Sequence, residues 1–146
     1  MSLLTDTIFY NALMADTIIV TITGGRIYST AVPCPDEQLD NVPVPYVIIT
    51  YDGMVNEGFT KDDSFEGTLD RVTIGILAVA EDRESLGKLL SKIRQQVENY
   101  LLQVEPTDSD ADLVPASYQI TANEIQYDSV KPCYFQSLQY VCDTNP

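Results

Sequence analysis

One stretch of the sequence constrains the fold most, because its apolar residues recur at the spacing of a single helix face. Between Asp82 and Val104 they fall at i, i+3, i+4 and i+7 without a break, which is the period of an amphipathic α-helix. The stripe consists of Leu86, Leu89, Leu90, Ile93, Val97, Tyr100, Leu101 and Val104. Pro106 ends the helix. One apolar face on one long helix requires a sheet to pack against.

Two segments before this helix have the composition of strands. Residues 45–51 open with a proline, which is tolerated at a strand's first position, and their run of apolar residues predicts an inner strand buried on both faces. A second strand is predicted from about Phe65 to Ala80, with Leu77 and Val79 on a second face that is covered near its end. Residues 52–65 are rich in Gly, Asn and Asp and predict a loop.

The ends of the chain complete the pattern. Residues 2–15 predict a short amphipathic helix. The β-branched residues 17–23 predict a strand, or a turn of helix running into a short strand, and Gly24 and Gly25 end the segment. Arg26 to Tyr28 form a short extended piece, followed by a loop to about Pro43.

After the long helix, an acidic loop is expected at 107–113. Tyr118, Ile120 and Ala122 differ in parity from Ile125 and Tyr127, which predicts a bulge or turn between them. Residues 132–142 predict a last strand, and residues 143–146 a frayed tail. The order of elements predicts an α+β fold: a single domain over residues 1–146, with a mainly antiparallel sheet, the long amphipathic helix packed on one face and a short N-terminal helix.

Charge and composition exclude several functions. The 146 residues include 22 acidic and 8 basic side chains, a net charge of −14, so the chain repels both nucleic-acid phosphate and anionic membranes. Histidine is absent, which removes Ser-His-Asp, Cys-His and HExxH chemistry from this chain. We therefore expect no enzyme, no cofactor and no metal site.

The cysteines and the N-terminus indicate a cytoplasmic setting. Cys34, Cys133 and Cys142 are odd in number and widely spaced, which favours reduced thiols over a disulfide framework. If Cys133 and Cys142 share one strand, their nine-residue separation places them on opposite faces. The first residues lack the basic and apolar regions of a signal peptide, and no run of apolar residues is long enough to span a membrane.

Two acidic clusters are candidate sites. Residues 108–112 begin like a calcium loop, but Leu113 and Gln119 occupy the positions that require Gly and Glu, so a solvated loop is favoured. Asp62 and Asp63 with Glu57 and Glu66 offer carboxylates for acid–base chemistry, yet nothing places them in a pocket. The nine tyrosines suit either an interface or ordinary sheet faces.

The order of several short motifs is more specific than any one of them. In sequence they are Ala12-Leu13-Met14-Ala15-Asp16, Gly25-Arg26-Ile27-Tyr28, Pro45-Tyr46-Val47-Ile48-Ile49 and Val72-Thr73-Ile74-Gly75-Ile76. With the long helix that follows, they resemble the tail completion and tail terminator proteins of long-tailed bacteriophages over residues 3–104. The resemblance implies a sheet covered by helices, and a six-membered ring that caps the tail tube and docks to the head connector. It brings no catalytic residues.

This resemblance directs attention to five residues as a subunit or partner interface: Arg26, Tyr28, Tyr46, Tyr51 and Phe59. Arg26 suits a bridge to a neighbour's carboxylates or an ion pair within the subunit. Tyr46 suits a partner contact or the start of the strand. The expected partners are further copies of the chain, the tail tube and the head connector, with DNA passing an acidic lumen without specific binding and no membrane contact.

The expected location is the virion, and the host cytoplasm during assembly. Two other classes stay open. One is an acidic bacterial adaptor or nucleic-acid mimic that binds a basic protein. The other is an enzyme that uses carboxylates alone.

Overall fold

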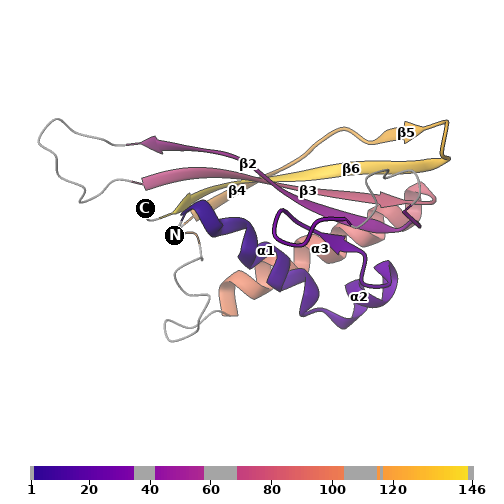
Figure 1. The fold of residues 1–146 in the computed structure, drawn as a ribbon, viewed down its shortest axis with the longest axis horizontal. Helices are drawn as coiled ribbons and strands as arrows, with labels where there is room; N and C mark the ends of the chain where they lie inside the picture. The colour runs from indigo at the N-terminus through magenta and orange to yellow at the C-terminus, as the bar shows by residue number, and fades with distance from the viewer. Residues whose placement is uncertain (1, 35–41, 58–68, 104–114, 116, 145–146) are drawn as a thin grey trace, which may run out of the picture.

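The computed structural model describes residues 2–34, 42–57, 69–103, 115 and 117–144. It has two layers, a long twisted sheet and a layer of helices on one of its faces (Figure 1). The helices are the 3₁₀ turn η1 (Ser2–Leu4), α1 (Thr5–Met14), α2 (Thr17–Thr23) and α3 (Arg83–Gln103). The strands are β1 (Ile27–Tyr28), β2 (Tyr46–Glu57), β3 (Leu69–Ala80), β4 (Ser117–Ala122), β5 (Gln126–Asp128) and β6 (Cys133–Thr144).

The sheet is mixed. Its strand order is β1-β2-β3-β6-β4, and β5 also pairs with β6. The two strands before the long helix, β2 and β3, pair in the antiparallel sense, with Ile49 opposite Ile76. β1 pairs with β2 in the parallel sense, so the sheet is antiparallel in all pairs but this one. The α+β class is confirmed, and the parallel pair and a second short α-helix are additions to it.

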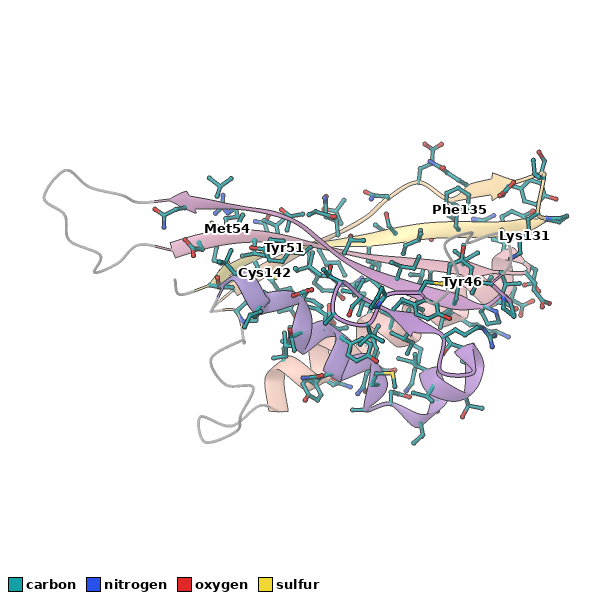
Figure 2. All side chains as sticks on the ribbon, in the orientation of Figure 1. Tyr46, Tyr51, Met54, Lys131, Phe135 and Cys142 are labelled. Atoms are coloured by element: carbon teal, nitrogen blue, oxygen red, sulfur yellow. The ribbon has the colours of Figure 1, made fainter. Side chains whose placement is uncertain are left out.

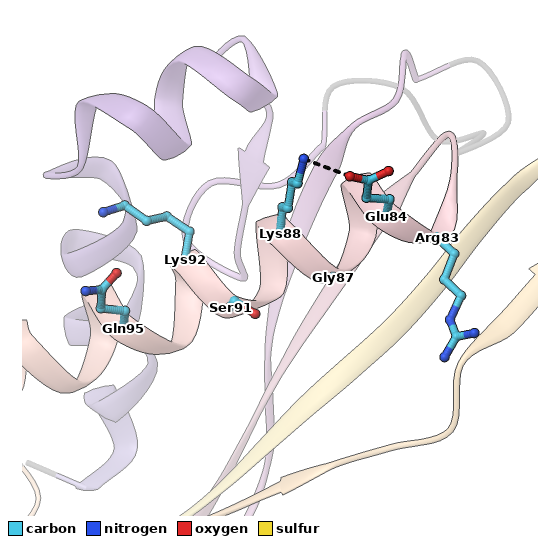
Figure 3. A pocket seen from close by; sticks show the side chains of 7 residues that line it. All are labelled: Arg83, Glu84, Gly87, Lys88, Ser91, Lys92 and Gln95. Carbon is cyan, nitrogen blue, oxygen red and sulfur yellow. Dashed lines mark ion pairs between the residues drawn. The ribbon is translucent and has the colours of Figure 1, made fainter.

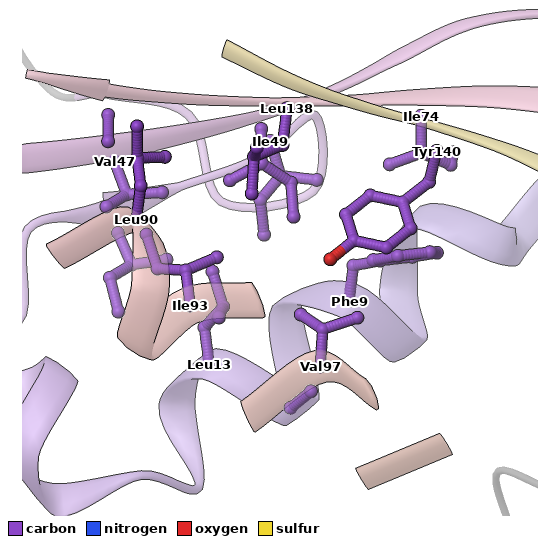
Figure 4. Close-up of a cluster of buried hydrophobic side chains, with 14 of the residues drawn as sticks. Phe9, Leu13, Val47, Ile49, Ile74, Leu90, Ile93, Val97, Leu138 and Tyr140 are labelled. Carbon is purple, nitrogen blue, oxygen red and sulfur yellow. The ribbon is translucent and has the colours of Figure 1, made fainter. Parts of the chain in front are cut away.

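The long helix lies where its stripe predicts. Asp82 caps its start, since its carboxylate accepts from the Ser85 amide at 2.7 Å and from the Ser85 hydroxyl at 3.1 Å, and these bonds lower the pKa of Asp82. The predicted stripe faces the sheet, with Leu86, Leu89 and Ile93 almost fully buried. Figure 4 shows this helix meeting α1 and the inner face of the sheet around Phe9 and Tyr140.

A second, smaller apolar cluster covers the opposite face of the sheet at one end. It contains Val42, Tyr46, Val79 and Cys133. The prediction that the end of the second strand is covered on both faces is therefore confirmed. Cys142 lies in the main core and Cys133 in this outer cluster, so the two thiols are on opposite faces of β6. None of the three cysteines forms a disulfide.

Of the two readings of residues 17–23, the strand is wrong, and the turn of helix running into a short strand is right only in its helical part, because the whole segment forms α2. The Asp16 carboxylate accepts from the amides of Ile18 at 2.8 Å and Ile19 at 3.1 Å, which is an N-cap. Gly24 closes the other end in the left-handed conformation, at φ 62°. Caps at both ends outweigh the strand preference of the β-branched residues between them.

Two predicted boundaries are also wrong. β2 continues through residues 52–57, which were predicted as loop, because a bulge between Tyr51 and Gly53 keeps it paired with β3. Gly53 makes this possible with φ 130°. β6 continues to Thr144, beyond the predicted start of a frayed tail. The predicted loop at 107–113 and residues 58–68 lie outside the described residues.

The predicted change of parity between Ala122 and Ile125 is confirmed. Ala122 pairs with Leu138 and Gln126 pairs with Phe135, so three residues between β4 and β5 stand opposite two on β6. The extra residue shifts the alternation by one position, so that Tyr127, opposite Tyr134, points to the same face of the sheet as Tyr118 and Ile120.

Candidate interaction surfaces

Arg26 is held inside the subunit at one end of the sheet. It follows the Gly24–Gly25 turn that ends α2, and its Nε donates to the carbonyl of Pro45 at 3.3 Å. The Val47 amide donates in return to the Arg26 carbonyl at 3.0 Å. Arg26 therefore ties β1 to the start of β2 through a carbonyl oxygen, and the residue is half-buried.

Tyr28 and Tyr46 lie at the same end of the sheet. Tyr46 is 7% exposed and belongs to the outer cluster, so it packs inside the subunit and starts the strand. Tyr28 packs against that cluster, and its pKa is raised, first by burial and then by the neighbouring Cys34. The structure thus brings together Arg26, Tyr28 and Tyr46, three of the five predicted interface residues.

Tyr51 lies on the face of the sheet that the helices cover, and it packs against the main core. Figure 2 shows it near Met54, toward the end of the sheet away from Tyr46. It lines a groove of about 420 Å³ with Leu3, Leu4, Asp6, Thr7, Thr30 and Ala31. Burial and the carboxylates of Asp70 and Asp6 raise the pKa of Tyr51. Its hydroxyl has no hydrogen-bond partner among the described residues. Phe59, the fifth predicted residue, lies outside the described residues.

The face of the sheet turned away from the helices is polar in its middle. A hollow of about 270 Å³ lies there over Gly75, bordered by Thr50, Asp52, Asn123, Ser137 and Gln139. Farther along, Arg71 Nε lies 3.0 Å from the Asp143 carboxylate, which also accepts from the Ser117 hydroxyl at 3.1 Å. These bonds lower the pKa of Asp143. The alternation of polar and apolar side chains along the strands is the sequence signal from which this polar face could have been predicted.

Several large apolar side chains are exposed. On β2, Met54 is 39% and Val55 is 61% exposed, near the end of a strand whose tip runs beyond the helix layer (Figure 1). On α2, Ile18 is 52% and Ile22 is 40% exposed, one helical turn apart. The α2 pair was not identified from the sequence, because neither reading of residues 17–23, a strand or a turn of helix running into a short strand, has a full helix with both residues on one face.

The described part of the chain offers no group of three or more Cys, Asp or Glu side chains arranged to hold a metal ion. The predicted loop at 108–112 lies outside that part, as do Asp62, Asp63 and Glu66. Within the same part, no helix is both long and apolar enough to cross a membrane.

Known proteins resemble this chain in fold and not detectably in sequence. No protein-family model matches it, and no curated protein matches it. A solved structure described as the virion of a native gene transfer agent (GTA) particle contains a chain with the same fold. That chain superposes with a TM-score of 0.60 and 12% sequence identity, over 97% of this chain and 94% of its own length. The chain therefore shares its whole fold with a component of that virion.

Proposed function

We propose that this protein is a structural component of a phage or prophage virion, which caps the tail tube and joins it to the head connector as a hexameric ring. The observation that carries the proposal is the fold match to a chain of the gene transfer agent virion, which spans nearly the whole of both chains. The order of motifs in residues 3–104 supports the narrower role in tail completion.

The charge of the chain suits a subunit that lines a passage for DNA. A ring of six such subunits carries six times the net charge of −14. An acidic lumen repels phosphate, so a duplex passes without being retained. The polar, open face of the sheet, with Asp52 at its middle, is the surface we assign to this lumen.

The ring closes through two different surfaces of each subunit, which is the head-to-tail arrangement that gives closed cycles. The far end of β2, with exposed Met54 and Val55, is the part we assign to contact with the tail tube or the connector. In this role the protein is not an enzyme and needs no cofactor.

Solution mass tests the proposal. Light scattering over a concentration series, with negative-stain imaging at the highest concentration, should reveal a ring of six 16.2 kDa chains, about 97 kDa, with an open pore wide enough for duplex DNA. A monomer at every concentration, also in the presence of the tail tube protein of the same particle, contradicts the proposal.

The acidic charge favours one alternative, an adaptor that binds a basic protein partner. That reading expects a stable monomer or dimer whose binding to a basic protein weakens steeply with salt. The same mass measurement separates the two, because the adaptor requires no ring.

A further inference from the structure

The outer face of α3 carries a shallow groove whose floor is made of small residues. The groove has a volume of about 760 Å³. Its lining comprises Arg83, Glu84, Gly87, Lys88, Ser91, Lys92 and Gln95. Figure 3 shows Gly87 and Ser91 on the helix between Lys88 and Lys92 on one side and Arg83 beyond the other. The face is therefore indented and edged by cations.

Gly87 is not required by the subunit itself. A β-carbon at this position meets nothing within 4 Å, and the residue lies inside an α-helix, where glycine is less favourable than any residue but proline. Alanine would therefore fit and would strengthen the helix. A glycine kept here is explained if another chain approaches the helix backbone closely.

The charges of the chain are divided along this helix. α3 contains four of the eight basic residues, Arg83, Lys88, Lys92 and Arg94, but only two of the 22 acidic ones, Glu84 and Glu98. Its net charge of +2 leaves −16 for the remainder of the chain. The next segment in sequence, residues 105–112, holds four acidic residues and no basic one.

The basic and acidic regions lie at different ends of the helix in sequence. The groove extends from the first residue of α3 to Gln95, and the acidic segment follows the C-terminal end of the helix in sequence. A helix of 21 residues is about 30 Å long. Each subunit therefore carries a cationic groove toward one end of a rigid rod and a strongly acidic segment after the other, which is the polarity that head-to-tail association needs.

We propose that the groove on α3 docks the acidic segment 105–112 of a second copy of the chain, and that this contact is one junction of the ring. The inference rests on the proposed function, because it assigns a junction to that ring. Lys88, the more exposed of the two lysines, faces the incoming carboxylates. Lys92 borders the groove while its Nζ lies 3.6 Å from the Asp16 carboxylate of its own subunit, and the floor at Gly87 and Ser91 lets the partner backbone approach.

A matched pair of variants tests the charge. Lys88 and Arg94 each pair with a glutamate one helical turn away, at 3.0 Å and 3.1 Å, and both are exposed. Lys88→Glu and Arg94→Glu change the net charge equally, but only the first alters the groove. We expect Lys88→Glu to raise the concentration at which the ring half-dissociates by about tenfold or more, and Arg94→Glu to change it much less.

A second variant tests the floor of the groove without changing charge. Gly87→Gln introduces a long helix-forming side chain where the subunit has open space. We expect its helix content and unfolding midpoint to equal or exceed those of the wild type, while ring formation is lost. If the Gly87→Gln chain forms rings as stable as those of the wild type, the inference is wrong.

A charge swap identifies the occupant. In a chain that carries both Lys88→Glu and Asp110→Lys, opposite charges meet again, so ring stability should recover relative to Lys88→Glu alone. If ring stability does not recover in the double variant, the assignment of segment 105–112 as the occupant is wrong. The assignment is also wrong if segment 105–112 of the wild-type chain covers the groove of its own subunit. If the wild type forms no ring, the proposed function fails; if it forms rings that Lys88→Glu leaves intact, only this inference fails.

Discussion

Asp52 lies so close over Gly75 on the open face of the sheet that a β-carbon at position 75 would stand 2.7 Å from its carboxylate oxygen. The Thr50 hydroxyl is equally close to that position. Gly75 therefore has no side chain because the neighbouring strand's side chains occupy its place. The bulge at Asp52 and the glycine on β3 are two parts of one packing arrangement.

Gly75→Ala should lower the free energy of unfolding by about 1 kcal/mol, since overpacking outweighs the smaller gain from restricting a glycine. In an Asp52→Ala background the loss should be smaller, because the new methyl then meets one side chain fewer. Chemical denaturation of the four chains of this double-mutant cycle measures the coupling. Strictly additive effects would contradict the contact.

Tyr140 keeps a buried hydroxyl without a hydrogen-bond partner among the described residues. Its ring packs 5.0 Å from that of Phe9 and 5.9 Å from that of Tyr118, and burial strongly raises the pKa of the phenol. Tyr140→Phe keeps the ring and removes the desolvated oxygen. We expect the free energy of unfolding to rise by about 1 kcal/mol; a clear loss on urea denaturation would mean that the hydroxyl is bonded.

Asp6 should give the free energy of unfolding a pH dependence opposite to that from Asp82 and Asp143, whose pKa values are lowered. Burial raises its pKa above the usual 3.8, so between 3.8 and the raised value the folded chain binds the proton and the unfolded chain does not. Its contribution to stability is therefore full below pH 3.8 and is lost as pH rises through the folded pKa. Asp6→Asn should remove this slope from unfolding curves at a series of pH values. Glu124→Gln, an exposed control, should retain it.

The three thiols should differ in reactivity. Burial, followed by the nearby Asp143, raises the pKa of Cys142 to about 12, and Cys133 is 5% exposed. Cys34 is half-buried and more accessible. A thiol reagent at pH 8 should label Cys34 first and the other two only in denaturant. Rapid labelling of Cys142 in the native protein, read by mass spectrometry, would contradict its burial.

The sequence predicted best where one local signal dominated. The stripe of α3, the inner position of β2 and the parity change before β5 were readable because period and burial coincide in them. α2 was misread because β-branched composition was weighed above the capping residues Asp16 and Gly24, although both were visible. The extension of β2 past Asp52 depends on pairing with a strand distant in sequence, which no local pattern reveals.

The candidate surfaces were less predictable than the fold. Arg26 and Tyr46 were chosen by position in a motif, and the structure gives both of them partners within the subunit. The groove on α3 escaped notice because lysines outside a helical stripe indicate only a solvated face. Recognising it required the open space above Gly87, which is a three-dimensional property.

The β2–β3 hairpin is held differently at its two ends. Where Tyr46 pairs with Val79, apolar clusters cover both faces of the sheet. At the other end the tip of β2 runs past the helix layer (Figure 1). The hairpin is therefore anchored at one end and unsupported by helices at the other. A force applied at its free end by a docked partner is transmitted along the paired strands to the anchored end, where Arg26 links β1 to the start of β2.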